Sequence, residues 1–170
     1  LQDVIKKLQR FVDPIVAVSP EEGVYWTPNG HHRLRALEKL NSMRDKIGYP
    51  EVARDYSALK VERGDYFGNV RRAAEFDKRR RLAQIGKPID RGEWEMTAPT
   101  VNAYYNSSMN DMNFPAGVLL PPLFDPKMDD APNYGNTGGT IGHELTHGFD
   151  DEGRQFDAAG NLKDWWTKED

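Results

Sequence analysis

The chain has 170 residues and a formal net charge of −4, from 23 basic and 27 acidic residues. This length fits one domain of ordinary size, with or without appendages. The absence of cysteine excludes a disulfide scaffold, a cysteine-ligated metal site and a thiol nucleophile. No apolar run approaches the roughly 20 residues that a membrane-spanning helix needs. Because the sequence begins without methionine or a recognisable signal peptide, we expect it to be cut from a longer protein.

The two halves of the chain differ in charge. Residues 1–90 carry 18 basic and 13 acidic residues, a net +5, whereas residues 91–170 carry 5 and 14, a net −9, and the two sum to −4. The residue pattern changes at the same place. Helical periodicity in the first half gives way to short β-forming stretches between turn residues in the second. We therefore expect two domains, a helical segment over 1–90 and a second region over 91–170.

The first half predicts two helices. Apolar residues recur at helical spacing over 28–47, where Ala36, Leu40, Met43 and Ile47 share one face. A second helix is predicted over 65–85, with an apolar stripe and, opposite it, a basic cluster. The stripe consists of Phe67, Val70, Ala74, Leu82 and Ile85, and the basic cluster consists of Arg71, Arg72, Lys78, Arg79, Arg80 and Arg81.

The basic cluster allows two interpretations. Arginine and lysine on one helix face can follow a nucleic-acid backbone. However, the chain is acidic overall, and Glu75 and Asp77 are interleaved with the basic residues as local partners. We therefore interpret the cluster as a solvated helix face and expect no nucleic-acid partner.

The second half predicts a small sheet and one more helix. Short strands are expected at Thr100–Tyr105 and Gly117–Leu120, joined by a polar loop. A polar loop is expected over 125–136, followed by an uneven helix over Thr137–Asp150. The predicted fold class is therefore α+β, predominantly α-helical with a small antiparallel sheet.

The predicted helix at 137–150 contains an H-E-x-x-H motif. Residues four apart lie on one helix face, so the imidazoles of His143 and His147 can reach a single ion at roughly 2.0–2.1 Å. Glu144 lies about 100° around the helix, where it can act as a general base towards a zinc-bound water without binding the metal. Asp150, three residues after His147, is expected to accept the other ring N–H of that ligand.

Two ordinary explanations compete with a metal site, namely a pair of surface histidines or a histidine packed in a core. Both are weakened because Ile141, Leu145 and Phe149 form an apolar stripe on a separate face of the same helix. One face can then anchor the helix while the other presents ligands, and we favour the metal site.

The third metal ligand is expected to be missing from the chain. The metzincin pattern requires glycine three residues and histidine six residues after the second histidine, but Asp150 and Gly153 stand there. The remaining option is a later glutamate. Glu152 is too close to the motif and Glu169 has no helix built around it.

Several blocks of the sequence resemble the neprilysin / endothelin-converting-enzyme family of zinc endopeptidases. The resemblance covers nearly the whole chain and rests on blocks in the right order, which is more specific than the metal motif alone. The blocks are Ala36–Leu40, Lys46–Pro50, Val101–Tyr105, Phe114–Gly117, Pro121-Pro122, Asn133–Gly135, Ile141–Asp151, Gly153-Arg154, Phe156-Asp157 and Trp165-Trp166.

The resemblance implies a fold and a set of residue roles. It implies a zincin-like (thermolysin-like) catalytic region over 91–170 that is incomplete at its C-terminal end. His143 and His147 would bind one Zn²⁺, Glu144 would be the catalytic base and Asp150 would orient a ligand. Asn102 and Ala103 would bind the substrate backbone from an edge strand. The third ligand, a glutamate, is expected beyond residue 170.

The resulting expectation is a fragment of a zinc metalloendopeptidase that hydrolyses oligopeptides, with cleavage before large hydrophobic residues and exclusion of larger folded proteins. The isolated fragment is expected to be inactive. Its partners would be peptide substrates and the remainder of the parent chain, with membrane contact only through an absent N-terminal anchor. The resemblance suggests an extracytoplasmic location, either secreted, periplasmic or on a membrane-anchored ectodomain. The alternative is a non-catalytic helical interaction module with a vestigial H-E-x-x-H.

Overall fold

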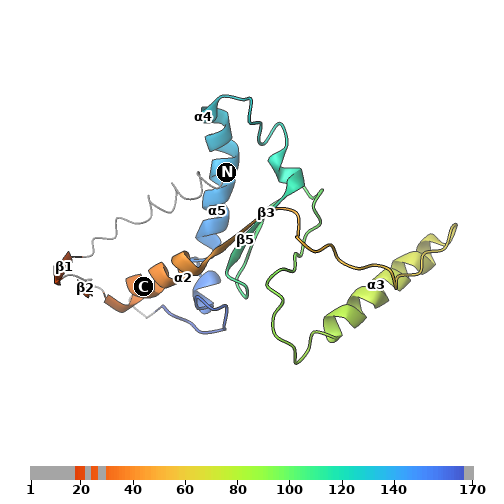
Figure 1. Cartoon of the computed structure of the whole chain (residues 1–170), viewed down its shortest axis with the longest axis horizontal. Helices are drawn as coiled ribbons and strands as arrows, with labels where there is room; N and C mark the ends of the chain where they lie inside the picture. The colour runs from red at the N-terminus through yellow and green to blue at the C-terminus, as the bar shows by residue number, and fades with distance from the viewer. Residues whose placement is uncertain (1–17, 22–23, 27–29, 167–170) are drawn as a thin grey trace. The chain divides into compact units, whose positions relative to one another are not determined.

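The computed structural model describes the backbone of residues 18–21, 24–26 and 30–166, and the side chains of residues 35–166. The chain divides into two compact units (Figure 1). The first combines Leu1–Tyr49 with Trp94–Asp170, and the second is Pro50–Glu93. These units have different bounds from the predicted domains 1–90 and 91–170, whose domain status stays a prediction.

A three-stranded sheet organises the first unit. Its order is β3 (Arg44–Gly48), β5 (Asp111–Pro115) and β4 (Tyr104–Asn106). β3 runs parallel to β5 and β4 runs antiparallel to it, so β3 and β5 lie side by side (Figure 1). The prediction of a small sheet is confirmed, but its purely antiparallel character was wrong. A separate two-stranded sheet pairs β1 (Val18–Glu21) with β2 (Val24–Trp26) in antiparallel orientation.

The helix predicted over 28–47 is shorter in the structure. α2 spans Gly30–Ser42, and the chain then continues as β3. The N–H of Arg44 donates to the carbonyl of Asn110 at 3.1 Å, and the parallel ladder with β5 begins there. Backbone pairing with a strand more than 60 residues away therefore overrides the helical spacing that includes Ile47.

The strand predicted at Gly117–Leu120 is also wrong. Ala116–Leu119 forms the 3₁₀ turn η1, directly after β5. The N–H of Gly117 donates to the carbonyl of Ala98 at 2.8 Å, and a β-carbon on Gly117 would lie 2.4 Å from the carbonyl oxygen of Pro99. This close approach to the 98–100 segment holds the chain in a turn.

The helix that carries the metal motif starts earlier than predicted. α4 (Asp130–Asn133), the π-helical turn η2 (Tyr134–Gly138) and α5 (Gly139–His147) follow one another as one helical rod (Figure 1). The sequence predicted a loop up to residue 136, because Pro- and Asn-rich composition is typical of loops. A short 3₁₀ turn, η3 (Gly153–Gln155), follows α5.

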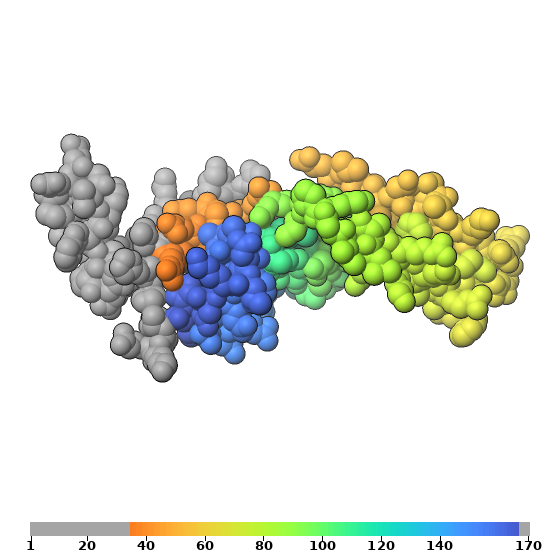
Figure 2. All heavy atoms as spheres, turned by 90° about the horizontal axis from the view of Figure 1, so that it is seen from below, coloured from red at the N-terminus to blue at the C-terminus, as the bar shows by residue number. Residues whose placement is uncertain are grey.

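The core of the first unit lies where α2, β5 and α5 meet. β5 is buried at all five positions. The buried apolar residues of this cluster are Leu40, Met43, Ala103, Met112, Phe114, Val118, Ile141 and Leu145. In the space-filling view, the orange segment that follows residue 34 lies against the blue C-terminal segment of the same unit (Figure 2).

The second unit contains α3 (Tyr66–Leu82). Asp65 caps its N-terminus by accepting the N–H of Gly68 at 2.9 Å, which agrees with the predicted start. No residue of α3 is buried within the described chain, and the predicted apolar stripe is exposed there, with Phe67 at 81%.

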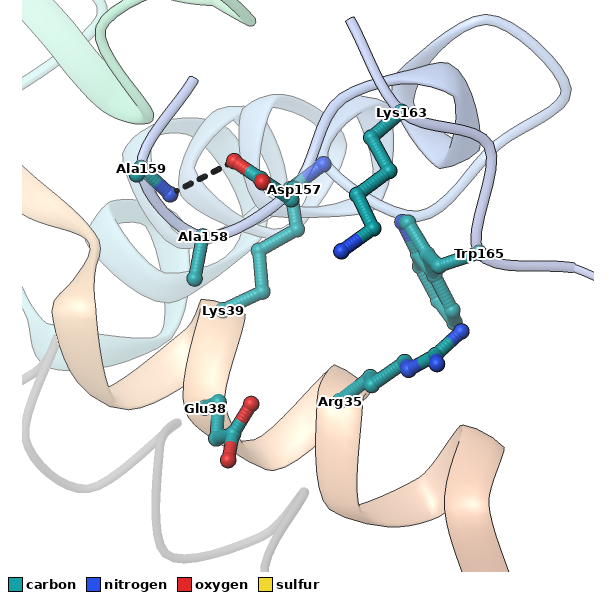
Figure 3. A pocket seen from close by; sticks show the side chains of 8 residues that line it. All are labelled: Arg35, Glu38, Lys39, Asp157, Ala158, Ala159, Lys163 and Trp165. Atoms are coloured by element: carbon teal, nitrogen blue, oxygen red, sulfur yellow. Dashed lines mark hydrogen bonds between the residues drawn. The ribbon is translucent and has the colours of Figure 1, made fainter. Parts of the chain in front are cut away.

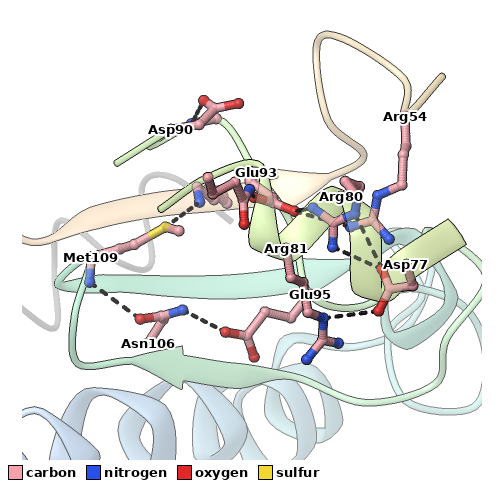
Figure 4. Close-up of polar contacts among 12 residues, drawn as sticks. Arg54, Asp77, Arg80, Arg81, Asp90, Glu93, Glu95, Asn106 and Met109 are labelled. Carbon is pink, nitrogen blue, oxygen red and sulfur yellow. Dashed lines mark hydrogen bonds and ion pairs between the residues drawn. The ribbon is translucent and has the colours of Figure 1, made fainter. Parts of the chain in front are cut away.

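Four residues of the basic cluster of α3, namely Arg72, Arg79, Arg80 and Arg81, form ion pairs with acidic residues of the second unit. Asp77 contacts both Arg80 at 3.0 Å and Arg81 at 2.8 Å, and Arg80 also contacts Glu93 (Figure 4). Arg79 lies 2.5 Å from Glu75 one helical turn away. These pairs favour the solvated-face interpretation, and the absence of a nucleic-acid partner stays a prediction.

Candidate metal centre

α5 brings the two histidines of the motif together. The Nε2 atoms of His143 and His147 lie 3.1 Å apart, with the rings edge to face at a centroid separation of 4.6 Å. Two nitrogens bound to one tetrahedral zinc at 2.0–2.1 Å lie roughly 3.4 Å apart. The imidazole pair therefore fits a shared zinc ion with only a small change in ring orientation.

Asp150 supports the second histidine from behind. Its Oδ2 lies 2.8 Å from Nδ1 of His147, while its Oδ1 accepts the N–H groups of Glu152 at 3.1 Å and Gly153 at 2.7 Å. A carboxylate at Nδ1 favours the tautomer that leaves the Nε2 lone pair for a metal. The same hydrogen bond raises the pKa of His147, chiefly through Asp150.

Glu144 is buried near both histidines and accepts a hydrogen bond from the backbone of β4. Its residue is 5% exposed, and burial raises the pKa of its carboxyl above the ordinary value. The neighbouring His143 and His147 and a hydrogen bond from the Tyr105 backbone N–H act in the opposite direction. A carboxylate with a raised pKa is a better proton acceptor than an ordinary surface glutamate.

The opposite face of α5 anchors it, as the sequence predicted. Ile141 is 1% exposed and Leu145 is 9% exposed, and Phe149 packs against the same core cluster. Phe149 also meets the Trp165 ring edge to face, with centroids 6.3 Å apart. The orientation of the histidines is therefore fixed by packing on the other side of the helix.

The predicted substrate residues lie beside this helix. β4 pairs with β5, and no other strand of the described chain pairs with it, so β4 is an edge strand that packs next to α5. Asn102 and Ala103 immediately precede β4; Ala103 is buried, and its N–H donates to Oδ1 of Asn102 at 2.9 Å. The structure thus places an exposed amide at the start of a free strand edge.

No third ligand accompanies the histidines in the part of the chain that the structure describes. Within those residues, no group of three or more His, Cys, Asp or Glu side chains could hold a metal ion. Glu152 is exposed, and its backbone N–H faces Asp150.

Sequence reasoning missed two contributors to this region. The sequence assigned Gly153 no contact with the metal helix, but a β-carbon there would lie 2.0 Å from the carbonyl oxygen of His147, so the chain folds back onto the end of α5. Tyr105 supplies the N–H that binds Glu144. The close contact at Gly153 could have been suspected from a glycine so soon after the motif. Nothing in the sequence around Tyr105 indicates its contact with Glu144.

Comparison with known proteins places this geometry in a family. The model of peptidase family M13 matches residues 102–170. Human neprilysin is 39% identical over 143 residues, which cover 79% of this chain and 19% of neprilysin. Neprilysin-11 of Caenorhabditis elegans is 40% identical over 141 residues, covering 78% of this chain and 17% of that protein. The chain belongs to peptidase family M13. The resemblance to neprilysin predicted from the sequence blocks is thereby confirmed.

Solved structures of M13 peptidases agree. The Mycobacterium tuberculosis zinc metalloprotease Zmp1, in complex with an inhibitor, matches with a TM-score of 0.81 and 46% identity over 99% of this chain and 24% of that one. PepO from Lactobacillus rhamnosis matches with a TM-score of 0.80 and 32% identity, covering 99% and 25%. The M13 chain described here spans about a fifth of the length of the curated relatives. Within its described residues, no helix has the length and apolar character to cross a bilayer.

Proposed function

We propose that this M13 segment supplies the metal-binding helix and the substrate strand of a zinc-dependent metalloendopeptidase that hydrolyses oligopeptides. The observation that carries the proposal is the 3.1 Å approach of the two Nε2 atoms, with Asp150 bound to the far side of the His147 ring. Membership of a peptidase family supports the same reaction. The catalytic region would be zincin-like, with α5 and β4 flanking the site.

His143 and His147 would hold one Zn²⁺ through Nε2, and a glutamate outside the 170 residues would complete the protein ligands. When bound, zinc polarises a carbonyl and makes water more acidic. Asp150 would hold His147 in its ligating tautomer. These roles are supported by the donor set, since two neutral imidazoles with a carboxylate behind one of them suit zinc.

Glu144 would move the proton. Its carboxylate would accept a proton from the attacking water and deliver it to the departing amine, so that the peptide C–N bond breaks as the amine becomes neutral. Burial, which raises its pKa, and the N–H of Tyr105, which holds the carboxylate in place, support this role.

Asn102 and Ala103 would bind an extended substrate along the free edge of β4, by adding the peptide as a further strand. The residues that follow them already pair with β5 on the other edge, so the strand is held before substrate arrives. We propose oligopeptide substrates cut before large hydrophobic residues, an extracytoplasmic location, and the remainder of a longer chain as the other partner of this segment.

Metal removal tests the proposal in the protein as it is encoded, with any flanking chain retained. A strong chelator should abolish peptide hydrolysis, and added Zn²⁺ should restore it. His143→Ala should weaken zinc binding by roughly a hundredfold or more because one of few ligands is lost. Thr146→Ala, an exposed change on the same helix, should bind zinc normally. Equal zinc binding by His143→Ala and the wild type would instead favour the alternative, a non-catalytic interaction module. No observation on this site favours that alternative.

The 170 residues alone should be inactive. Among their described side chains, only two imidazoles converge, which leaves zinc with too few protein ligands. A purified preparation of this segment should therefore bind zinc more weakly than the encoded protein and show no chelator-sensitive peptide hydrolysis. Turnover that depends on Glu144 in the isolated segment would contradict this proposal.

A further inference from the structure

Lys39 is a buried cation that the proposed reaction does not use. It lies on α2, its residue is 1% exposed, and its Nζ donates to two main-chain carbonyls, that of Gly153 at 2.6 Å and that of Phe156 at 2.9 Å. Nζ also lies 5.8 Å from the ring centre of Tyr105 and 5.9 Å from that of Phe149. Among the described residues, the ammonium thus contacts two carbonyls and two aromatic rings, and it forms no ion pair with a carboxylate.

The two carbonyls belong to the turn that leaves the metal helix. Figure 3 shows the Lys39 side chain running from α2 towards the 157–158 segment, and Lys163 projecting into the pocket that both lysines line. Lys39 thus connects α2 to a turn more than 110 residues later in the chain, and its hydrogen bonds hold that turn in place. We call this pair of hydrogen bonds the Lys39 clamp. A buried ammonium can be retained only if its donors are satisfied, so the carbonyls must stay where they are.

Gly153 links the clamp to the candidate metal centre. Its carbonyl accepts from Lys39, and its N–H donates to Oδ1 of Asp150 at 2.7 Å, while Oδ2 of Asp150 binds Nδ1 of His147 at 2.8 Å. A continuous series of hydrogen bonds therefore runs from the Lys39 ammonium, through one residue and one carboxylate, to a histidine ligand.

A second contact joins Lys39 to the substrate strand. Its main-chain carbonyl accepts from Nδ2 of Asn110 at 2.9 Å, and Oδ1 of Asn110 accepts from the hydroxyl of Tyr105 in β4 at 2.8 Å. Asn110 is fully buried and has a positive φ of 51°. The backbone of Lys39 thus contacts Asn110, which binds the substrate strand. Its side chain contacts the turn that follows the metal helix.

We propose that Lys39 is a positioning residue for the zinc site, which fixes the Gly153–Phe156 turn and through it the orientation of Asp150 against His147. The inference rests on the proposed zinc function. Burial lowers the pKa of Lys39 to about 8, with Asp150 and Asp157 opposing the shift, so at neutral pH the side chain still carries its charge.

A double-mutant cycle in zinc affinity tests this role, measured by competition with a chromophoric chelator in the protein as encoded. Lys39→Met keeps the apolar stem and removes the donors, and should weaken zinc binding roughly tenfold, the lower end for loss of a ligand's support. In an Asp150→Ala background, the same change should alter the affinity less than about twofold, because the link is already cut. Lys163→Met removes an exposed lysine of the same pocket and should change nothing.

Nitrogen NMR of the metal-free protein gives a second reading. The His147 ring should be mainly the Nδ1–H tautomer in the wild type and a mixture of tautomers in Lys39→Met. Lys163→Met should give the wild-type spectrum.

A merely structural loss would weaken zinc binding equally in both backgrounds of the cycle, and this result overturns the proposal. Unchanged zinc affinity in Lys39→Met also overturns it. If Lys39→Met does not fold, Lys39→Gln, which keeps an N–H donor, replaces it in the cycle. A wild-type protein that binds no zinc overturns the proposed function itself, and so is distinct from a failure of the Lys39 link.

Discussion

Glu144→Gln is expected to reduce peptide hydrolysis by roughly a thousandfold while zinc affinity and stability stay nearly unchanged. Glutamine has the same shape as glutamate, and its carbonyl oxygen can still accept the Tyr105 N–H that holds the side chain. What it lacks is a site that can take up a proton. Because Glu144 is adjacent to the histidines without being one of the proposed ligands, the metal should remain bound.

The measurement pairs initial rates on an oligopeptide with a zinc competition assay on the same preparation. Glu152→Gln is the matched control, since Glu152 is an exposed glutamate in the turn after the same helix and contacts Asp150 only through its main chain. It should retain normal rates. Loss of zinc from Glu144→Gln would mean that Glu144 is a ligand, and undiminished rates would remove it from the reaction.

Gly153→Ala is expected to lower the free energy of unfolding by about 3 kcal/mol or more, the upper range for overpacking. The new methyl group would lie 2.0 Å from the carbonyl oxygen of His147 and 2.6 Å from the carbonyl carbon of Gly148. Both neighbours are backbone atoms at the end of α5, so neither can swing aside. Relief requires the turn to move away from the helix, which would also withdraw the Gly153 N–H from Asp150.

Chemical denaturation of the two proteins measures this effect. Gly139→Ala is the control, because Gly139 is an exposed residue of the same helix with nothing within 4 Å of an added β-carbon. There the substitution should raise stability by up to about 1 kcal/mol, since alanine favours the helix. Equal stability of Gly153→Ala and the wild type would show that the turn is not pressed against the helix end.

The candidate site was predictable because its chemistry is local in sequence. His143, His147 and Asp150 lie within eight consecutive positions, and helix geometry alone brings the two rings to one face. The apolar stripe through Ile141 and Leu145 fixes which face is buried. The roles assigned to these residues stay proposals, but their spatial arrangement follows from spacing.

The sheet was less predictable because its pairing is not local. The residues of β3 continue the apolar spacing of α2, and only β5, far along the chain, turns them into a strand. The stretch after β5 has strand-forming composition, yet the contact of Gly117 with Pro99 turns it into a 3₁₀ helix. In both places a backbone contact between distant segments decides the conformation. Secondary-structure propensity, which depends on neighbouring residues alone, cannot predict such a contact.

Lys39 shows the same limit for a polar residue. From its own helix alone, Lys39, which lies between Glu38 and Leu40, would be predicted to be an ordinary solvent-exposed lysine. Its burial depends on two carbonyls supplied by a turn that follows the metal motif. α3, by contrast, was predicted to within a few residues because its cap at Asp65 and its ion pairs are contained within the second unit.

The insertion of Pro50–Glu93 between β3 and the rest of its unit bears on how M13 proteins of this kind can diversify. A parallel strand pair needs a crossover, and here the excursion includes a complete helical unit. For a flexible connection, doubling the length adds only about 0.6 kcal/mol to the entropy of ring closure. Evolution can therefore lengthen, shorten or replace this excursion at little thermodynamic penalty, while β3 keeps its register with β5 in the sheet beside the candidate metal centre.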